Sequence, residues 1–115
     1  MKLFINGHIK HTSEAVISVF DRGLVYGEGL FESFRVRRLK EDGSLHCPFL
    51  GRHMERMAAS AQTLGIPLPP WFGTEQDMRA LITQLLTENG LEDSDVKLMI
   101  TCLLYTSPSP RDPTK

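Results

Sequence analysis

The sequence holds little cysteine, carries almost no net charge and lacks any long apolar run. Its 115 residues include two cysteines, Cys47 and Cys102, which have no metal-site spacing and predict free thiols in a reducing compartment. A formal net charge of −1 gives no electrostatic footprint for nucleic acid or anionic membrane. No apolar run is long enough to span a bilayer, and MKLFINGHIK lacks the apolar core of a signal peptide. We therefore expect a cytoplasmic protein without nucleic-acid or membrane partners.

Several common catalytic signatures are absent as well. The glycine-rich stretch GLVYGEG (23–29) has neither the G-x-G-x-x-G spacing nor the Lys-Ser/Thr pair of phosphate-binding loops. The sequence contains no G-x-S-x-G element and no clear Ser/His/Asp arrangement. Four histidines fit no standard zinc spacing, so no metal site is expected: His8, His11, His46 and His53.

The first half of the chain has β-strand patterns. Short strands on either side of Asn6-Gly7 predict a type I′ hairpin, because both residues tolerate positive φ. Further strands are predicted at 15–20, 30–39 and 45–50, the last two separated by a turn at Asp42-Gly43.

The second half changes to helical spacing. A first helix carries an apolar stripe and stops at Gly65, the stripe being Leu50, Met54, Met57, Ala61 and Leu64. Thr74, with Asp77 three residues on, predicts a capped second helix that ends at Asn89-Gly90. Its expected buried face is Met78, Leu81, Ile82, Leu85 and Leu86. Residues 95–101 return to a strand pattern.

These elements predict an α+β fold, in which a mostly antiparallel sheet packs with two helices. The length allows one domain, which we place at residues 1–102. Residues 103–115 contain three prolines and lose all periodicity, so we expect a disordered and non-native tail.

Arg56 is the first candidate for chemistry. It lies three residues after His53, so both project to roughly the same side of the first helix, flanking its apolar stripe. A partly shielded arginine binds phosphate or carboxylate well, because its fork of donors matches an oxyanion. The commoner fate of a lone helix arginine is to stay at the surface and pair with a carboxylate, here Glu55 or Glu32.

The loop that precedes the strand at 30–39 is the second candidate. A pocket could be lined by Tyr26, Phe31 and Phe34. The surrounding glycines would let the backbone come close to a ligand there. Aromatic residues in a small domain more often fill its core. Asp21-Arg22 is read most simply as a structural ion pair or a turn former.

The order of the motifs is more specific than any one of them. Three stretches together resemble the N-terminal domain of the class IV, or fold type IV, pyridoxal-phosphate enzymes. They are FINGHI (4–9), SVFDRGLVYGEGLFESFRV (18–36) and LGRHMERMAASAQTLGIPLP (50–69). That family includes branched-chain aminotransferase, D-amino acid aminotransferase and aminodeoxychorismate lyase. The resemblance covers residues 3–101, and its specific part is D-R-G-x-x-Y-G-x-G-x-F-E followed by H-x-x-R.

The resemblance implies roles for four residues. Arg56, in the H-x-x-R position, matches the arginine that holds the phosphate of pyridoxal 5′-phosphate. Tyr26 and Phe31 match positions that line the substrate pocket, and Arg35 stands at a variable position that helps to set substrate preference. The implied partner is a small amino acid or aminodeoxychorismate, and the implied full-length form is a homodimer.

The same resemblance implies that catalytic groups lie elsewhere. In the family, the lysine that forms a Schiff base with the cofactor belongs to a second domain, and no lysine here sits in a matching motif. We therefore expect this chain to be a fragment that is inactive alone, with transaminase and lyase activities both open for the parent enzyme. The alternative is a stand-alone, non-catalytic module that binds a small anion through Arg56 or binds a partner protein.

Overall fold

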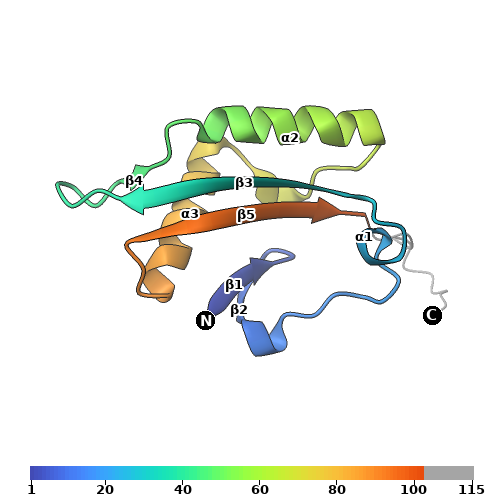
Figure 1. The fold of residues 1–115 in the computed structure, drawn as a ribbon, viewed down its shortest axis with the longest axis horizontal. Helices are drawn as coiled ribbons and strands as arrows, with labels where there is room; N and C mark the ends of the chain where they lie inside the picture. Colours follow the sequence, from blue (N-terminus) through green and yellow to red (C-terminus); the bar gives the residue numbers. More distant parts are fainter. Residues whose placement is uncertain (103–115) are drawn as a thin grey trace.

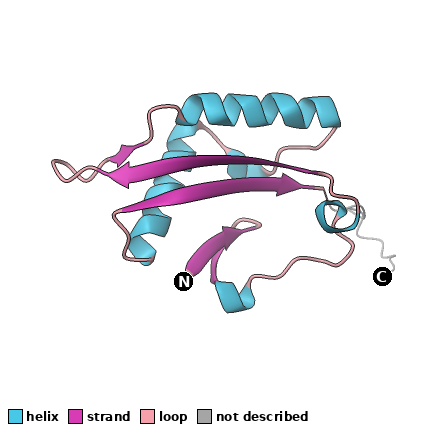
Figure 2. Cartoon of the chain, in the orientation of Figure 1, coloured by secondary structure: helices cyan, strands magenta, loops and turns pink. Residues whose placement is uncertain are grey.

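The computed structural model describes residues 1–102 of the chain, so the tail predicted at 103–115 lies outside the described residues. The strands are β1 (Lys2–Ile5), β2 (His8–His11), β3 (Gly29–Arg38), β4 (Leu45–His46) and β5 (Asp93–Thr101). The helices are α1 (Arg22–Val25), α2 (Leu50–Leu64) and α3 (Glu75–Glu88), with 3₁₀ turns η1 (Thr12–Glu14) and η2 (Pro70–Phe72). The α+β class is as expected (Figures 1 and 2).

Within residues 1–102, the strands form two antiparallel sheets. In the larger one, β3 lies between β4 and β5, and Phe31 stands opposite Met99. In the smaller one, β1 and β2 form the predicted hairpin, whose turn has φ values of 50° at Asn6 and 91° at Gly7. Positive φ at both residues is the requirement of a type I′ turn, so the local prediction is confirmed.

The core lies on one side of the larger sheet. Helix α2 runs beside β3, and α3 crosses behind the two long strands (Figure 1). Among the described residues, thirteen buried side chains from strands, helices and loops form one cluster: Val36, Cys47, Leu50, Met54, Met57, Ala61, Ile66, Phe72, Met78, Ile82, Leu86, Leu98 and Ile100.

The end of α2 corrects one expected core residue. Leu64 is 59% exposed, whereas Ile66, just after the helix, is buried. Gly65 adopts a left-handed φ of 73°, which reverses the chain so that the Ile66 amide donates to the Ala61 carbonyl at 2.9 Å. This closure brings Ile66 into the core in place of Leu64.

Helix α3 begins as predicted. The Asp77 amide donates to the Thr74 hydroxyl at 3.1 Å, and the Thr74 amide donates to the Asp77 carboxylate at 2.9 Å. Met78, Ile82 and Leu86 are buried, while Leu81 and Leu85 are half-buried. Further along the helix, Arg79 donates to the carbonyls of Leu45 and Cys47 at 3.2 and 2.9 Å, which ties α3 to the β4 region.

Two predicted strands differ from the structure. Residues 15–20 form no strand and expose Val16, Ile17, Val19 and Phe20, because an extended segment needs a partner for its backbone groups and the described sheets supply none. The strand predicted at 45–50 ends at His46, where Arg79 takes the following carbonyl and Pro48 has no amide to donate.

Alternation along β3 divides the larger sheet into two faces. We call the side packed on α2 and α3 the covered face; its β3 residues are Leu30, Glu32, Phe34 and Val36. The opposite side is the open face, which carries Phe31, Ser33, Arg35 and Arg37 of β3 with Asp93, Asp95, Lys97 and Met99 of β5.

Candidate functional site

Arg56 on α2 is held by Glu32 on the covered face of β3. Its Nε donates to Glu32 Oε2 at 2.9 Å, and its Nη2 donates to Glu32 Oε1 at 2.7 Å. The Glu32 side chain is only 11% exposed, whereas that of Arg56 is 66% exposed. The carboxylate of this ion pair is therefore shielded from solvent, whereas its guanidinium lies at the surface.

His53, one turn earlier on α2, binds the same carboxylate. Its Nδ1 lies 2.7 Å from Glu32 Oε1, and its ring stacks on Phe34 with centroids 4.8 Å apart and planes 24° apart. An ionised carboxylate only accepts hydrogen bonds, so the geometry assigns a proton to Nδ1 of His53. Glu32 Oε1 thus accepts from both His53 and Arg56.

These contacts keep Glu32 ionised. The hydrogen bond from Arg56 is the main cause that lowers the pKa of Glu32 below its ordinary value, and the bond from His53 adds to it, while burial opposes them. The same hydrogen bond raises the pKa of Arg56. Glu32 and Arg56 are therefore both charged at neutral pH and form an ion pair.

Arg56 keeps donors to spare after binding Glu32. A guanidinium has five N–H groups, and Glu32 takes one from Nε and one from Nη2. The 3.5 Å contact between Nη2 and His53 Nδ1 cannot be a hydrogen bond when that nitrogen carries a proton. Within residues 1–102, both N–H groups of Nη1 and the second N–H group of Nη2 therefore have no acceptor. One N–H of Nη1 and the second N–H of Nη2 form a fork at the outer, exposed edge of the guanidinium.

The loop before β3 is braced by Asp21, which is buried. Its carboxylate caps α1 by accepting from the Gly23 amide at 2.7 Å and also accepts from the Thr101 hydroxyl of β5 at 2.8 Å. A side chain at position 23 would meet Thr101, because a Cβ there would lie 2.5 Å from its Cγ2. Asp21 is thus a turn former, as one of the two sequence interpretations had it.

Tyr26 and Phe31 are the exposed aromatics at the beginning of β3. Tyr26 packs against the guanidinium of Arg22, 4.5 Å from the ring centroid, and Arg22 is paired with Glu28. Phe31 lies on the open face with Lys97 Nζ 4.9 Å from its ring centroid. Both side chains are about 60% exposed, so neither fills the core.

Arg35 lies further along the open face and is engaged by carboxylates. Its guanidinium nitrogens lie 3.1 Å from Asp95 and 3.5 Å from Asp93, both on β5. Four residues of strand separate it from Phe31, which is roughly 13 Å. The structure therefore places Tyr26 and Phe31 at one end of the sheet, Arg35 nearer the other end, and Arg56 with Glu32 on the covered side.

Sequence reasoning named Glu32 only as one of two possible partners of Arg56, and it named Asp21 only as an ion-pair partner of Arg22 or a turn former. The signal for Glu32 was available, because a charged residue occupies the apolar phase of β3 between Leu30 and Phe34. No local signal could connect Asp21 with Thr101, since 80 residues separate them. Phe34, a pocket candidate in the sequence, instead packs against the core and His53.

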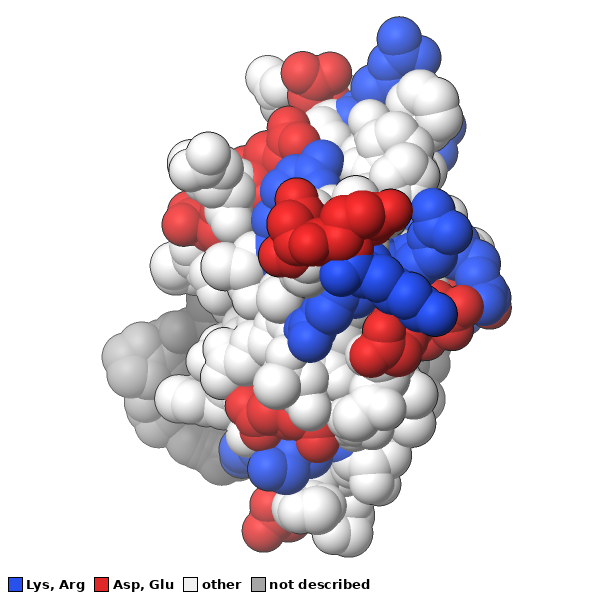
Figure 3. All heavy atoms as spheres, turned by 90° about the vertical axis from the view of Figure 1, so that its left-hand side faces the viewer, with Lys and Arg blue, Asp and Glu red and all other residues white. Residues whose placement is uncertain are grey.

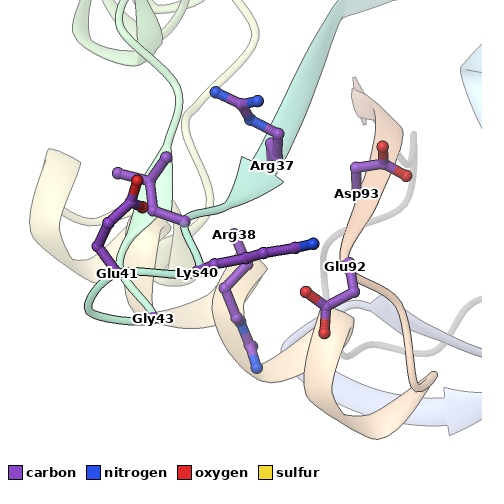
Figure 4. A pocket seen from close by; sticks show the side chains of 8 residues that line it. Arg37, Arg38, Lys40, Glu41, Gly43, Glu92 and Asp93 are labelled. Atoms are coloured by element: carbon purple, nitrogen blue, oxygen red, sulfur yellow. The ribbon is translucent and has the colours of Figure 1, made fainter.

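A pocket of about 840 Å³ lies elsewhere, where β3 ends and β5 begins (Figure 4). It is lined by Arg37, Arg38, Leu39, Lys40, Glu41, Gly43, Glu92 and Asp93. Basic and acidic side chains are equally numerous in this lining, and Figure 3 shows both signs intermixed on this side of the molecule. The pocket contains none of the four candidate residues and has no net charge that would select an ion.

Residues 1–102 hold no group of three or more histidine, cysteine or acidic side chains placed to bind a metal ion. In the same part of the chain, no helix has the length and apolar character needed to cross a membrane.

Comparison with known proteins decides the family. The family model for amino-transferase class IV matches residues 29–114. The chain belongs to the class IV aminotransferase family. It is 35% identical over 101 residues to a putative branched-chain-amino-acid aminotransferase of Methanocaldococcus jannaschii, a match that covers 88% of this chain and 32% of the relative. It is 28% identical to the aminodeoxychorismate lyase of Bacillus subtilis, covering 85% of this chain and 30% of the relative.

Solved structures agree on the fold. The branched-chain aminotransferase of Thermoproteus uzoniensis, solved with norvaline, superposes with a TM-score of 0.73 at 25% identity over 97% of this chain and 37% of that one. A second branched-chain amino acid aminotransferase, complexed with N-(5′-phosphopyridoxyl)-L-glutamate, gives 0.70 at 21% identity over 92% of this chain and 34% of that one. The chain thus has the fold of the class IV N-terminal domain and spans about a third of its relatives' length.

Proposed function

We propose that this chain is the N-terminal part of a pyridoxal-phosphate-dependent class IV enzyme and that Arg56 holds the phosphate of the cofactor. The observation that carries the proposal is the free outer fork of the Arg56 guanidinium, which remains after Glu32 has taken its Nε edge. Two adjacent N–H groups on a planar guanidinium match two oxygens of a phosphate. The residues present therefore fit the group.

The cofactor assignment is also supported by similar proteins. One structural neighbour was solved with a phosphopyridoxyl amino acid. When bound, pyridoxal phosphate acts as an electron sink for the amino-acid substrate. We assign two separate parts to this chain: Arg56, on the covered side of β3, binds the phosphate, and aromatic residues at the beginning of β3 form one wall of the substrate site.

Tyr26 and Phe31 are proposed to form that wall. Both rings stay more than half exposed beside the cations of Arg22 and Lys97, and the Asp21 cap holds the loop that carries Tyr26. Arg35 is proposed to affect substrate preference. Because Asp93 and Asp95 already neutralise its charge, it would act by supporting this part of the open face rather than as a free cation.

The proposed reaction is amino-group transfer with branched-chain amino acids, since the relatives named above include branched-chain aminotransferases at 35% and 25% identity. Lyase action on aminodeoxychorismate is the second candidate, favoured by the similarity to the Bacillus subtilis enzyme.

These 115 residues alone are proposed to be inactive. Four lysines fall in the described residues, at positions 2, 10, 40 and 97. None of these four lysines lies in a motif that matches the family's Schiff-base lysine. A lysine and a second wall for the cleft must then come from the parent protein. A full-length homodimer in the cytoplasm completes the proposal, supported by the exposed apolar residues of the open face and by the low cysteine content of the sequence.

Cofactor titration of the full-length apoenzyme tests the proposal. Removing a charge-assisted, two-point contact costs roughly 1.5–3 kcal/mol, so Arg56→Ala should weaken pyridoxal phosphate binding about ten- to a hundredfold. Arg56→Lys should recover part of the loss, because an ammonium cannot reproduce the fork. Equal affinities for wild type and Arg56→Ala would refute the phosphate assignment.

The stand-alone module is tested separately. The DNA that follows codon 101 in the source either continues into a second domain, as we expect, or ends in a native stop. Aminotransferase and lyase assays on the 115 residues should show no turnover, and measurable turnover would refute the fragment hypothesis.

A further inference from the structure

The Glu32 carboxylate orients the Arg56 guanidinium without using all of its hydrogen-bond donors. It binds the Nε edge of the guanidinium, with contacts of 2.9 Å to Nε and 2.7 Å to Nη2. That choice leaves the opposite edge, formed by Nη1 and Nη2, free for a second oxyanion. A carboxylate at the outer edge would instead have excluded one.

Glu32 is itself held in place. His53 Nδ1 donates to Oε1 at 2.7 Å, and the His53 ring is fixed by stacking on Phe34. The Glu32 side chain is 11% exposed, so it lies among packed neighbours instead of sampling solvent. A flexible, exposed arginine is thus fastened to a rigid strand through one rigid carboxylate.

We propose that Glu32 is the positioning residue of the phosphate site: it holds the Arg56 guanidinium with its outer fork directed at the cofactor phosphate, and His53 holds Glu32. The inference rests on the proposed function. Arginine has a large rotamer entropy, and fixing the side chain before binding removes that cost from the binding step. Glu32 touches neither substrate nor cofactor in this role.

The test is a double-mutant cycle on the full-length apoenzyme. Wild type, Glu32→Gln, Arg56→Ala and the double variant are each titrated with pyridoxal 5′-phosphate and with pyridoxal, which lacks the phosphate. Glu75→Gln is the matched control, because Glu75 binds the same Nε and Nη2 edge of Arg79 on α3, at 3.2 and 3.0 Å.

Glu32→Gln should weaken pyridoxal phosphate binding about tenfold, the size of effect expected for loss of arginine preorganisation. In the Arg56→Ala background the same change should add less than about twofold, since no guanidinium remains to be positioned. Affinity for pyridoxal should be equal in all variants, and Glu75→Gln should match wild type with both ligands.

Three results would overturn the inference. Unchanged or tighter binding in Glu32→Gln would show that Glu32 is neutral or competes with the phosphate. An equal loss in the Arg56→Ala background, or an equal loss of pyridoxal affinity, would show a purely structural role.

Two further variants keep the outcomes separate. If Glu32→Gln fails to fold, Glu32→Asp, which keeps the charge but shortens the reach, should lose about threefold, and wild-type affinity there would overturn the inference. If Arg56→Ala weakens binding and the Glu32 variants do not, positioning fails alone. If Arg56→Ala binds like wild type, the proposed phosphate site fails first.

Discussion

The two faces of strand β3 share one backbone but differ in the burial and the partners of their side chains. On the covered face, Leu30, Phe34 and Val36 pack against the helices, and one carboxylate, Glu32, is shielded with three hydrogen bonds. On the open face, Phe31 and its cross-strand neighbour Met99 remain more than half exposed beside the Arg35 ion pairs.

The difference separates stability from recognition. The apolar residues of the covered face already have their partners in this chain, so changes to them should alter folding, whereas Glu32 on that face also positions Arg56 in the proposed phosphate site. Large apolar side chains left exposed on the open face mark a surface meant to be covered by other protein or ligand. Alternation at a period of two lets a single strand serve both purposes.

The largest expected effect is the loss of a core side chain. Leu50→Ala on α2 removes a fully buried residue and should lower the free energy of unfolding by about 2–5 kcal/mol, measured by denaturant titration. Met99→Ala on the open face is the matched change and should stay within about 0.5 kcal/mol of wild type. Similar losses for both would remove the distinction between the faces.

The next effect concerns association of the open face. We expect the isolated chain to self-associate, and the double variant Phe31→Ser, Met99→Ser should weaken that association tenfold or more. Burying one such side chain contributes about 1.5–3 kcal/mol. Sedimentation and hydrophobic-dye binding measure it. A wild-type chain that stays monomeric at high concentration and binds no dye would contradict the expectation.

A smaller effect is the pH dependence contributed by Glu32. Because the pKa of Glu32 is lowered below its ordinary 4.5 on folding, its stabilisation is fully present above that value and is lost as the pH falls through the folded pKa. Between about pH 6 and pH 3, wild type should lose about 1 kcal/mol more unfolding free energy than Glu32→Gln.

Comparing these two proteins cancels the other carboxyls whose pKa is lowered, which are Glu28, Asp42, Asp77 and Glu88. Parallel pH profiles would mean that the Glu32 cluster does not couple to folding.

The smallest effect is expected for Arg35. Its partners are exposed, and exposed ion pairs contribute roughly 0–1 kcal/mol. Arg35→Gln should leave the midpoint of denaturant unfolding unchanged and shift the substrate preference of the full-length enzyme. An equal kcat/KM ratio for two substrates of different size in wild type and variant would remove Arg35 from the specificity proposal.

The elements that sequence reasoning predicted well are those whose causes are local. The Asn6-Gly7 turn, the Gly65 stop and the Thr74–Asp77 cap depend on φ preferences and on side chains within three residues. The segment at 15–20 shows the limit of the same reasoning. Its residues favour a strand, but a strand exists only where a partner takes its hydrogen bonds.

The candidate site divides in the same way. By its order of motifs, the sequence alone determined the family, the helix that carries Arg56 and the apolar phase of the strand that carries Glu32. Only the tertiary structure decided that Arg56 binds Glu32 and not Glu55, that Arg35 faces Asp93 and Asp95, and that Asp21 reaches Thr101. Periodicity shows which side of an element is apolar, whereas the pairing of side chains 24 or 80 residues apart depends on how the elements pack.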